Sequence, residues 1–174
     1  MARSNTPLFG RYMSADFETI AILPRTLGLL GEPEGAKREM LVMRVGPRPI
    51  GIFADEADFV VRWKEPAPLP RAPRAVVGVV AVRGRIYTVL DPHVLLALDG
   101  ELASGFIVTL RGEEQLALAV ERVEGVIEVA ERKLQSLGGG DALIRGVVEH
   151  AGELIAVLDC ARIFAAASNE KAGR

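Results

Sequence analysis

Asp91 and Asp159 are the two side chains of this sequence whose type and placement could support acid–base chemistry. They occupy the same position in two copies of a repeated segment, and two carboxylates can share one proton in a catalytic dyad, as in aspartic proteases. Those enzymes have an Asp-Thr/Ser-Gly loop at each site, whereas these aspartates are followed by Pro-His and Cys-Ala. Each aspartate stands instead where a strand gives way to a helix, and a carboxylate there caps the free backbone N–H groups. Helix capping is the favoured interpretation.

The remaining reactive side chains are few and are not grouped. His93 and His150 are the only histidines, and neither has further ligands at the spacing of a metal site. Cys160 is the single cysteine, which excludes an internal disulfide, and no triad partner is evident for it. Glycine-rich phosphate-binding motifs are also missing. The sequence therefore predicts no metal, no cofactor and no catalysis.

The equivalence of the two aspartates comes from an internal repeat. Residues 78–91 read GVVAVRGRIYTVLD and residues 146–159 read GVVEHAGELIAVLD, with identical residues at seven of fourteen positions. Upstream, residues 40–54 align with residues 106–120. Self-similarity of this kind indicates a duplicated module. Such modules more often present surfaces than host chemistry.

Each copy of the repeat has the pattern of short β-strands, in which runs of Val, Ile and Leu are bounded by Gly, Pro and charged residues. The expected strands are 40–45, 49–54, 76–82 and 85–90 in the first copy and 106–111, 115–120, 123–129, 143–149 and 153–158 in the second. A helical turn or irregular strand is expected at 55–62, and short helices at 92–98 and 160–167. Five short strands per copy suit a small barrel, because closure removes exposed sheet edges.

Composition indicates a soluble globular protein. The chain has 174 residues, of which 49% are hydrophobic and 25% charged. A net charge of −2 and an aromatic content of 5% do not favour nucleic-acid binding. The apolar run at 20–30 is interrupted by Pro24, Arg25 and Thr26, so it does not resemble a signal peptide, and no run is long enough to span a membrane. We expect a cytoplasmic protein with no nucleic-acid partner and no direct membrane insertion.

Two segments have no counterpart in the repeat. Residues 1–38 contain Gly, Pro and mixed charges, which indicates either a flexible tail or an extension whose apolar part docks on another surface. Residues 64–74, KEPAPLPRAPR, contain four prolines and should form an extended connection. As an alternative, Pro70 and Pro73 have the spacing of a ligand for a separate SH3 domain. A short C-terminal tail is expected at 167–174.

A more specific pattern is carried by residues 69–91, LPRAPRAVVGVVAVRGRIYTVLD, and residues 143–159, LIRGVVEHAGELIAVLD. The first resembles the stretch of CheW-like domains in which a proline-containing lead-in precedes GV-x-x-x-RG-x-x-x-P-V-I-D, and the second resembles the closing stretch of that family. The resemblance covers about residues 39–166. It implies an all-β fold of two tandem SH3-like five-stranded β-barrels with short helices. The barrels would cover about 39–98 and 104–166. The resemblance does not decide whether the two barrels exchange strands.

The resemblance also implies a function. CheW proteins are non-enzymatic adaptors that couple chemoreceptors to the histidine kinase CheA, so we expect an adaptor in a chemosensory array for chemotaxis or for pilus or gliding motility. Its partners would be the CheW-like regulatory domain of a CheA-type kinase and the cytoplasmic hairpin of a chemoreceptor. The alternatives are a CheW-like module recruited to a different signalling complex and, with Asp91 and Asp159 as catalysts, an aspartyl-type hydrolase.

The expected protein-binding residues lie around the Arg-Gly turn of the first copy. Arg83 matches an arginine that lies near the receptor-contacting region in the family, and arginine is favoured at interface hot spots. The full set of predicted protein-binding residues is Arg83, Gly84, Phe59, Arg62, Trp63 and Val82. A solvated hairpin arginine and a core tryptophan are the alternatives at Arg83 and Trp63. The sequence departs from the family in four places, with Phe59 for a typical glutamate, Ala81-Val82 for Asn-Leu, Thr88 for proline and Pro92-His93 for Leu-Arg.

Overall fold

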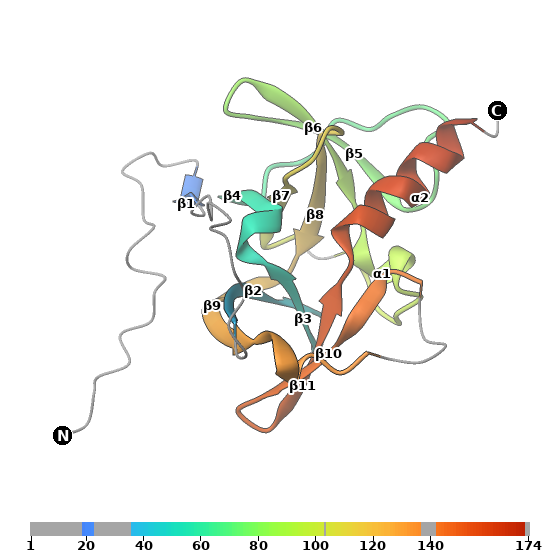
Figure 1. Cartoon of the computed structure of the whole chain (residues 1–174). Helices are drawn as coiled ribbons and strands as arrows, with labels where there is room; N and C mark the ends of the chain where they lie inside the picture. The colour runs from blue at the N-terminus through green and yellow to red at the C-terminus, as the bar shows by residue number, and fades with distance from the viewer. Residues whose placement is uncertain (1–18, 23–35, 103, 137–141, 173–174) are drawn as a thin grey trace.

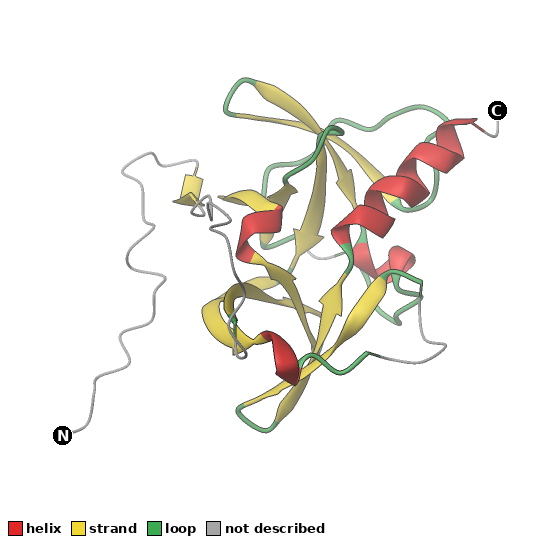
Figure 2. Cartoon of the chain, in the orientation of Figure 1, coloured by secondary structure: helices red, strands yellow, loops and turns green. Residues whose placement is uncertain are grey.

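The computed structural model describes residues 19–22, 36–102, 104–136 and 142–172. These residues form two mixed β-sheets, which make up the two lobes of the molecule in Figure 1, with helices along their margins (Figure 2). Sheet A contains, in spatial order, β1 (Thr19–Ile22), β4 (Ala57–Arg62), β7 (Phe106–Leu110), β8 (Leu116–Val120), β6 (Arg85–Leu90) and β5 (Val76–Val82). Sheet B contains β10 (Ile144–His150), β11 (Glu153–Leu158), β3 (Arg48–Phe53), β2 (Lys37–Val45) and β9 (Arg122–Ala130).

Each sheet takes strands from both halves of the chain. The hairpin β2–β3 from the first half lies between β11 and β9, whereas the hairpin β7–β8 from the second half lies between β4 and β6. The junctions are the two parallel pairs, β11 with β3 and β6 with β8. The sheets are therefore equivalent units that exchange their first hairpins.

The predicted strands are confirmed, and both helices end at positions other than those expected. The helix α1 (Pro92–Leu95) is shorter than the predicted 92–98. It stops because Ala97 adopts a φ of 48°, and the Leu98 N–H turns back to donate to the His93 carbonyl at 2.8 Å. The helix α2 (Cys160–Ala172) is longer than predicted. The segment 55–62 forms the end of a 3₁₀ turn (Ala54–Glu56) and the strand β4.

The expected closure of each sheet into a barrel is not detected among the described strand pairs, which leave both sheets open. In place of a continuous closing strand pair, each sheet has one isolated β-bridge at its margin. Ala67, in the proline-rich connection, bridges Val79 on the edge strand β5, and Gln135 bridges Val147 on β10. Gly78 lies beside the first bridge, where a Cβ atom would come within 2.4 Å of the Ala67 carbonyl oxygen. Each sheet is thus joined at its margin by a close backbone contact and not by a continuous strand pair.

Three hydrophobic clusters form the core. The largest contains residues of both sheets, such as Leu41 and Ile52 from sheet B and Val108 and Leu118 from sheet A, and it packs the sheets together. A second cluster belongs to sheet A alone and contains Val61, Val80, Val82, Tyr87, Val89, Ile107, Ala117 and Ala119. A third belongs to sheet B alone and contains Met40, Val42, Phe53, Val129, Val148, Ile155 and Val157. Because β4, β7 and β8 contribute to both the shared cluster and their own, sheet A buries apolar residues on both faces.

Candidate protein-binding surface

Phe59 stands at an irregularity of β4. The pairing of β4 with β7 is regular at Val60 and Val61 but shifts between Ala57 and Val60. In the shifted segment the fully buried hydroxyl of Thr109 accepts a hydrogen bond from the Phe59 N–H at 2.9 Å and donates one to the Phe59 carbonyl at 3.4 Å. A bulge re-aims the side chain that it carries. The Thr109 hydroxyl therefore supports the position from which Phe59 presents its half-buried ring.

Arg111 holds the other residue of the same bulge. Its guanidinium Nε lies 2.8 Å from the carboxylate of Asp58, and a terminal nitrogen donates to the Ala57 carbonyl at 3.1 Å. Both side chains are partly buried, which strengthens the pair relative to a fully solvated one. The bulge is thus restrained on both sides of Phe59.

Arg83 and Gly84 form the tight turn between β5 and β6. Both residues have positive φ, 49° and 77°, as a two-residue type I′ hairpin requires. The equivalent turn of the second copy has the same conformation, with 52° at Ala151 and 81° at Gly152. The backbone of the turn is therefore common to both copies, and the exposed arginine side chain is particular to the first.

The structure brings Arg83 to Phe59. The guanidinium carbon lies 5.6 Å from the centroid of the Phe59 ring, within the range of a cation–π interaction. In sheet order, β4 and β5 are separated by β7, β8 and β6. The sheet must therefore curve so that its two ends approach each other on this side.

The other predicted residues lie near the end of β4 or in the hairpin β5–β6. Trp63 follows β4, is half-buried against the sheet A cluster, and donates from its indole Nε1 to Glu65 at 3.4 Å. Arg62 is exposed at the end of β4. Val82 is only 4% exposed and belongs to the sheet A cluster beneath the turn. Its side chain supports the surface but does not form part of it.

β1 lies along the outer edge of β4 (Figure 1). Its Ile22 is paired with Phe59, Ala21 with Val60 and Thr19 with Val61, in antiparallel orientation. This strand is the part of the N-terminal extension that the structure describes between residues 1 and 35. For residues 1–38, the sequence was compatible with either a flexible tail or an apolar segment docked on another surface. In the structure, residues 19–22 are docked on β4.

The two aspartates act as helix caps. The Asp91 carboxylate accepts a hydrogen bond from the His93 N–H at 2.9 Å, and the Asp159 carboxylate accepts one from the Arg162 N–H at 3.1 Å. Asp91 also lies 3.2 Å from Nδ1 of the buried His93 ring, and Asp159 contacts the guanidinium groups of Arg145 and Arg162. Each carboxylate thus accepts a hydrogen bond from a backbone N–H of the helix that follows it, which is what a helix cap does.

Cys160, next to Asp159, is not a nucleophile in this setting. Its side chain is 3% exposed, and burial together with the nearby Glu56 raises the pKa of the thiol well above its usual value. The thiolate is the reactive form of cysteine. The residue therefore remains a neutral thiol that packs with the shared core.

A network of charges holds the connection from sheet B to sheet A. The Phe53 ring lies 3.6 Å from the guanidinium carbon of Arg38 and 5.3 Å from that of Arg145. Arg38 binds both oxygens of Asp55, at 2.9 and 3.0 Å, and Arg145 binds Glu56 at 2.7 Å. Burial lowers the pKa of Arg145, but the hydrogen bond to Glu56 and the nearby negative charges of Glu56 and Asp159 together outweigh burial, so the pKa is raised. The sequence offered no signal for this network, because its members come from four separate elements.

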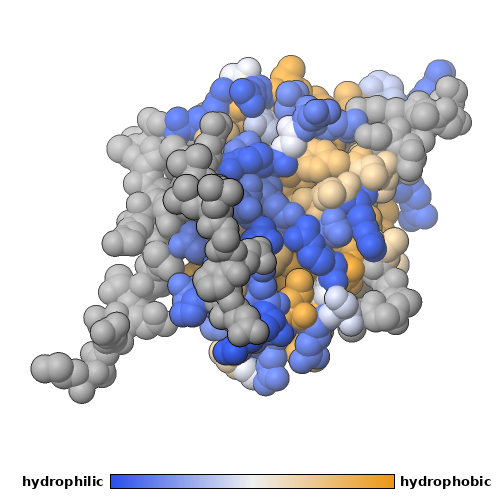
Figure 3. Space-filling model, viewed as in Figure 1, coloured by the Kyte–Doolittle hydropathy of each residue, from blue (hydrophilic) through white to orange (hydrophobic). Residues whose placement is uncertain are grey.

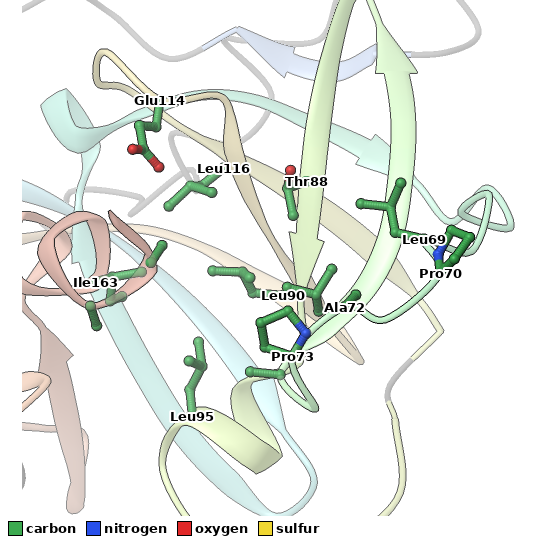
Figure 4. Close-up of a pocket in the computed structure, with 14 residues that line it drawn as sticks. Leu69, Pro70, Ala72, Pro73, Thr88, Leu90, Leu95, Glu114, Leu116 and Ile163 are labelled. Atoms are coloured by element: carbon green, nitrogen blue, oxygen red, sulfur yellow. The ribbon is translucent and has the colours of Figure 1, made fainter. Parts of the chain in front are cut away.

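An apolar groove of about 440 Å³ lies between sheet A and α2. In Figure 4, Leu90 and Leu116 come from the parallel pair of β6 and β8, Ile163 comes from α2, and Pro73 comes from the proline-rich connection. Figure 3 shows hydrophobic surface beside α2 on the same face. A second groove of about 450 Å³ adjoins the equivalent pair of β11 and β3 in sheet B. Because both copies carry a groove, its presence follows from the duplication.

Within the described residues, no group of three or more His, Cys, Asp and Glu side chains could hold a metal ion. The described helices are also too short or too polar to cross a membrane.

A family model described as "CheW-like domain" matches residues 39–168, which is most of the chain. The chain belongs to the CheW-like domain family. It is 26% identical over 131 residues to the chemotaxis protein CheW of Thermotoga maritima, in an alignment that covers 72% of this chain and 87% of that protein. It is 24% identical over 145 residues to the CheW of Treponema pallidum, with 76% and 85% covered.

The solved structures include a CheW fold that this chain matches. The scaffolding protein TtCheW from Thermoanaerobacter tengcongensis superposes with a TM-score of 0.66 at 18% identity, over 74% of this chain and 86% of that one. The predicted fold class is thereby confirmed as a mostly β CheW fold of two sheets with short helices. CheW scaffolds are chemotaxis coupling adaptors without catalytic activity, so the prediction of a non-enzymatic scaffold is also confirmed. The hydrolase alternative is wrong, since Asp91 and Asp159 cap separate helices within such a scaffold.

Proposed function

We propose that this chain is a cytoplasmic adaptor that couples chemoreceptors to a CheA-type histidine kinase in a chemosensory array, serving chemotaxis or pilus or gliding motility. Membership of the CheW-like family over residues 39–168 is the observation that carries the proposal. The relatives named chemotaxis protein CheW support it. An adaptor acts by binding two partners at once, which raises the effective concentration of one beside the other. This mode of action needs two surfaces and no catalytic centre.

The receptor would bind the Phe59–Arg83 patch, which we define as Phe59, Arg62, Trp63, Arg83 and Gly84. An exposed guanidinium beside a half-buried aromatic ring suits a helical receptor hairpin that presents apolar and acidic side chains. Arginine and tryptophan are also among the residues that most often dominate binding energy. The buried Val82 beneath the turn gives the patch a rigid support.

The kinase regulatory domain would bind the end of sheet B that carries Leu154. This side chain is 65% exposed, next to the Ala151–Gly152 turn, and its equivalent in sheet A is Ile86 at 63%. Large apolar side chains at such exposed positions support a protein contact. Ile86 lies in the hairpin of Arg83, beside the proposed receptor surface, and Leu154 is the most exposed of the other large apolar side chains that the structure describes, so we assign it to the second partner.

Co-sedimentation with receptor cytoplasmic fragments and a CheA-type kinase tests the proposal. We expect the chain to be retained with both, Arg83→Ala to lose the receptor and keep the kinase, and Leu154→Asp to do the reverse. Arg85→Ala is the matched control, because it removes an exposed arginine from the same hairpin. Loss of both partners for the unmodified chain at about 10 μM, where complexes of moderate affinity persist, would contradict the adaptor role. Retention of the kinase domain alone would favour a module that serves a different signalling complex.

A further inference from the structure

β1 is a feature of this chain that the family match does not include. The matched region starts at residue 39, whereas β1 spans Thr19–Ile22. Its partner is β4, a strand well within the matched region. β1 therefore lies outside the region that matches the family model and pairs with a strand inside it.

The same edge is treated differently in the two copies. β9 is the counterpart of β4 in sheet B, and among the residues that the structure describes, it pairs with β2 and with no strand on its other side. The covering of β4 is thus not a consequence of the duplication. An uncovered sheet edge accepts an extended segment through its free backbone groups, which is a common mode of peptide recognition.

β1 covers the edge at the position of the Phe59–Arg83 patch. Ile22 is the residue paired with Phe59, whose ring lies beneath the guanidinium group of Arg83. A partner that docks across this patch would meet the backbone of β1 at its margin.

We propose that the edge of β4 is a docking site for an extended segment, which residues 19–22 occupy in cis, so that β1 competes with the partner of the Phe59–Arg83 patch. The identity of that partner as a chemoreceptor hairpin rests on the proposed function. The pairing of β1 with the edge of β4 does not depend on that identity.

The pairing has the features of a removable segment. β1 has four residues, fewer than the usual five or six of a strand, and its register shifts between Thr19 and Ala21. Its sequence, Thr-Ile-Ala-Ile, favours extended structure and carries no charge that would fix it to one neighbour. A short and irregular edge strand is among the first elements to open in a native protein.

The test uses the full chain with the double substitution Ile20→Pro/Ala21→Pro. Successive N–H groups of a strand point to opposite sides, so two adjacent prolines remove the donor that faces β4 whichever residue carries it. Thr26→Pro/Leu27→Pro is the matched control, since it adds the same two rings to the extension outside β1. Hydrogen exchange of residues 57–63 is measured for both, with sheet B as the folding reference because β1 does not pair with it.

We expect faster exchange in β4 and a roughly five- to fiftyfold tighter affinity for the receptor fragment with Ile20→Pro/Ala21→Pro, and neither effect with the control. Unchanged exchange at β4 would overturn the occupancy, whatever the receptor does. Faster exchange with equal or weaker receptor affinity would overturn the competition and leave the proposed function standing. Loss of receptor binding by the unmodified chain as well would overturn the proposed function, while the exchange result still decides the occupancy.

Discussion

The guanidinium carbon of Arg83 lies 5.6 Å from the centre of the Phe59 ring, although the two residues belong to elements that sheet order separates by three strands. The contact depends on the curvature of sheet A, and it joins Phe59, one of the four departures from the family pattern, to Arg83, which matches that pattern. A partner that reaches one of these side chains also reaches the other. The patch should therefore respond as a unit to substitutions at either position.

Arg83→Ala should weaken receptor binding by about 1–2 kcal/mol, roughly five- to thirtyfold, because it removes the guanidinium group that lies over the Phe59 ring. The free energy of unfolding should change by less than about 0.5 kcal/mol, as for other surface substitutions. Ala151 already adopts the same turn conformation in the second copy, so alanine fits this backbone. Titration calorimetry and urea unfolding measure the two quantities, and equal binding by Arg83→Ala and Arg85→Ala would remove Arg83 from the interface.

Phe59→Ala and Trp63→Ala should separate binding from stability. Trp63 packs against the sheet A cluster, so its truncation should lower the free energy of unfolding by about 1–3 kcal/mol. Phe59 stands on a bulge with a half-buried ring, so its truncation should lower partner retention more than the melting temperature. Pull-down and thermal melting of both variants are the measurements. A lowered melting temperature with full retention for Phe59→Ala would assign its ring to the core.

Thr109→Val should destabilise the protein by about 1–3 kcal/mol, since it keeps the shape of the side chain but leaves the Phe59 N–H and carbonyl without their partner. Thr88→Val, at a partly exposed position in the apolar groove, is the control and should have little effect. Urea unfolding compares the two. A similar loss for both variants would show that the Thr109 hydroxyl is not what holds the bulge.

Cys160 should make the stability fall as the pH rises. Its thiol has a raised pKa in the folded state, mainly through burial, whereas the unfolded chain ionises it near its usual value of about 8.5. Above that pH the unfolded state binds fewer protons than the native state, so the free energy of unfolding should decrease by up to about 1.4 kcal/mol per pH unit. The slope between about pH 9 and 10 should be smaller in Cys160→Ala, which isolates this residue from other titrating groups. Equal slopes in urea unfolding would contradict the buried thiol.

The strands could be predicted from the sequence because their signal is local. In β5 and β11, for example, runs of Val, Ile and Leu adjoin a Gly-containing turn, and the structure has the predicted bounds for both. The exchange of hairpins could not be derived in this way. It depends on which strands pair across long stretches of the chain, as Leu41 does with Val126, and no local pattern records that choice.

The binding role of the predicted residues stays a prediction. The structure brings Phe59 and Arg83 together and packs Trp63 on the same cluster as Phe59, whereas Arg62 is exposed at the end of β4 and Val82 is buried. The bulge could not be foreseen, because the Thr109 hydroxyl that supports Phe59 is 50 residues away in the chain. β1 did leave a signal, the uninterrupted Thr-Ile-Ala-Ile run, but the edge that it covers is defined only by tertiary structure.

The exchanged hairpins also set an order of events during synthesis. Sheet A needs residues up to Val120, whereas sheet B needs residues from Lys37 to Leu158. The hairpin β2–β3 leaves the ribosome before the hairpin β7–β8, yet β2 must wait for β9 and β3 must wait for β11 before each has its neighbour in the other half of the chain. During that interval its apolar residues, Leu41 and Ile52 among them, lack the partners that later strands supply. The lobe that contains the first hairpin is therefore completed last, and exposed apolar strands of this kind favour aggregation of the nascent chain.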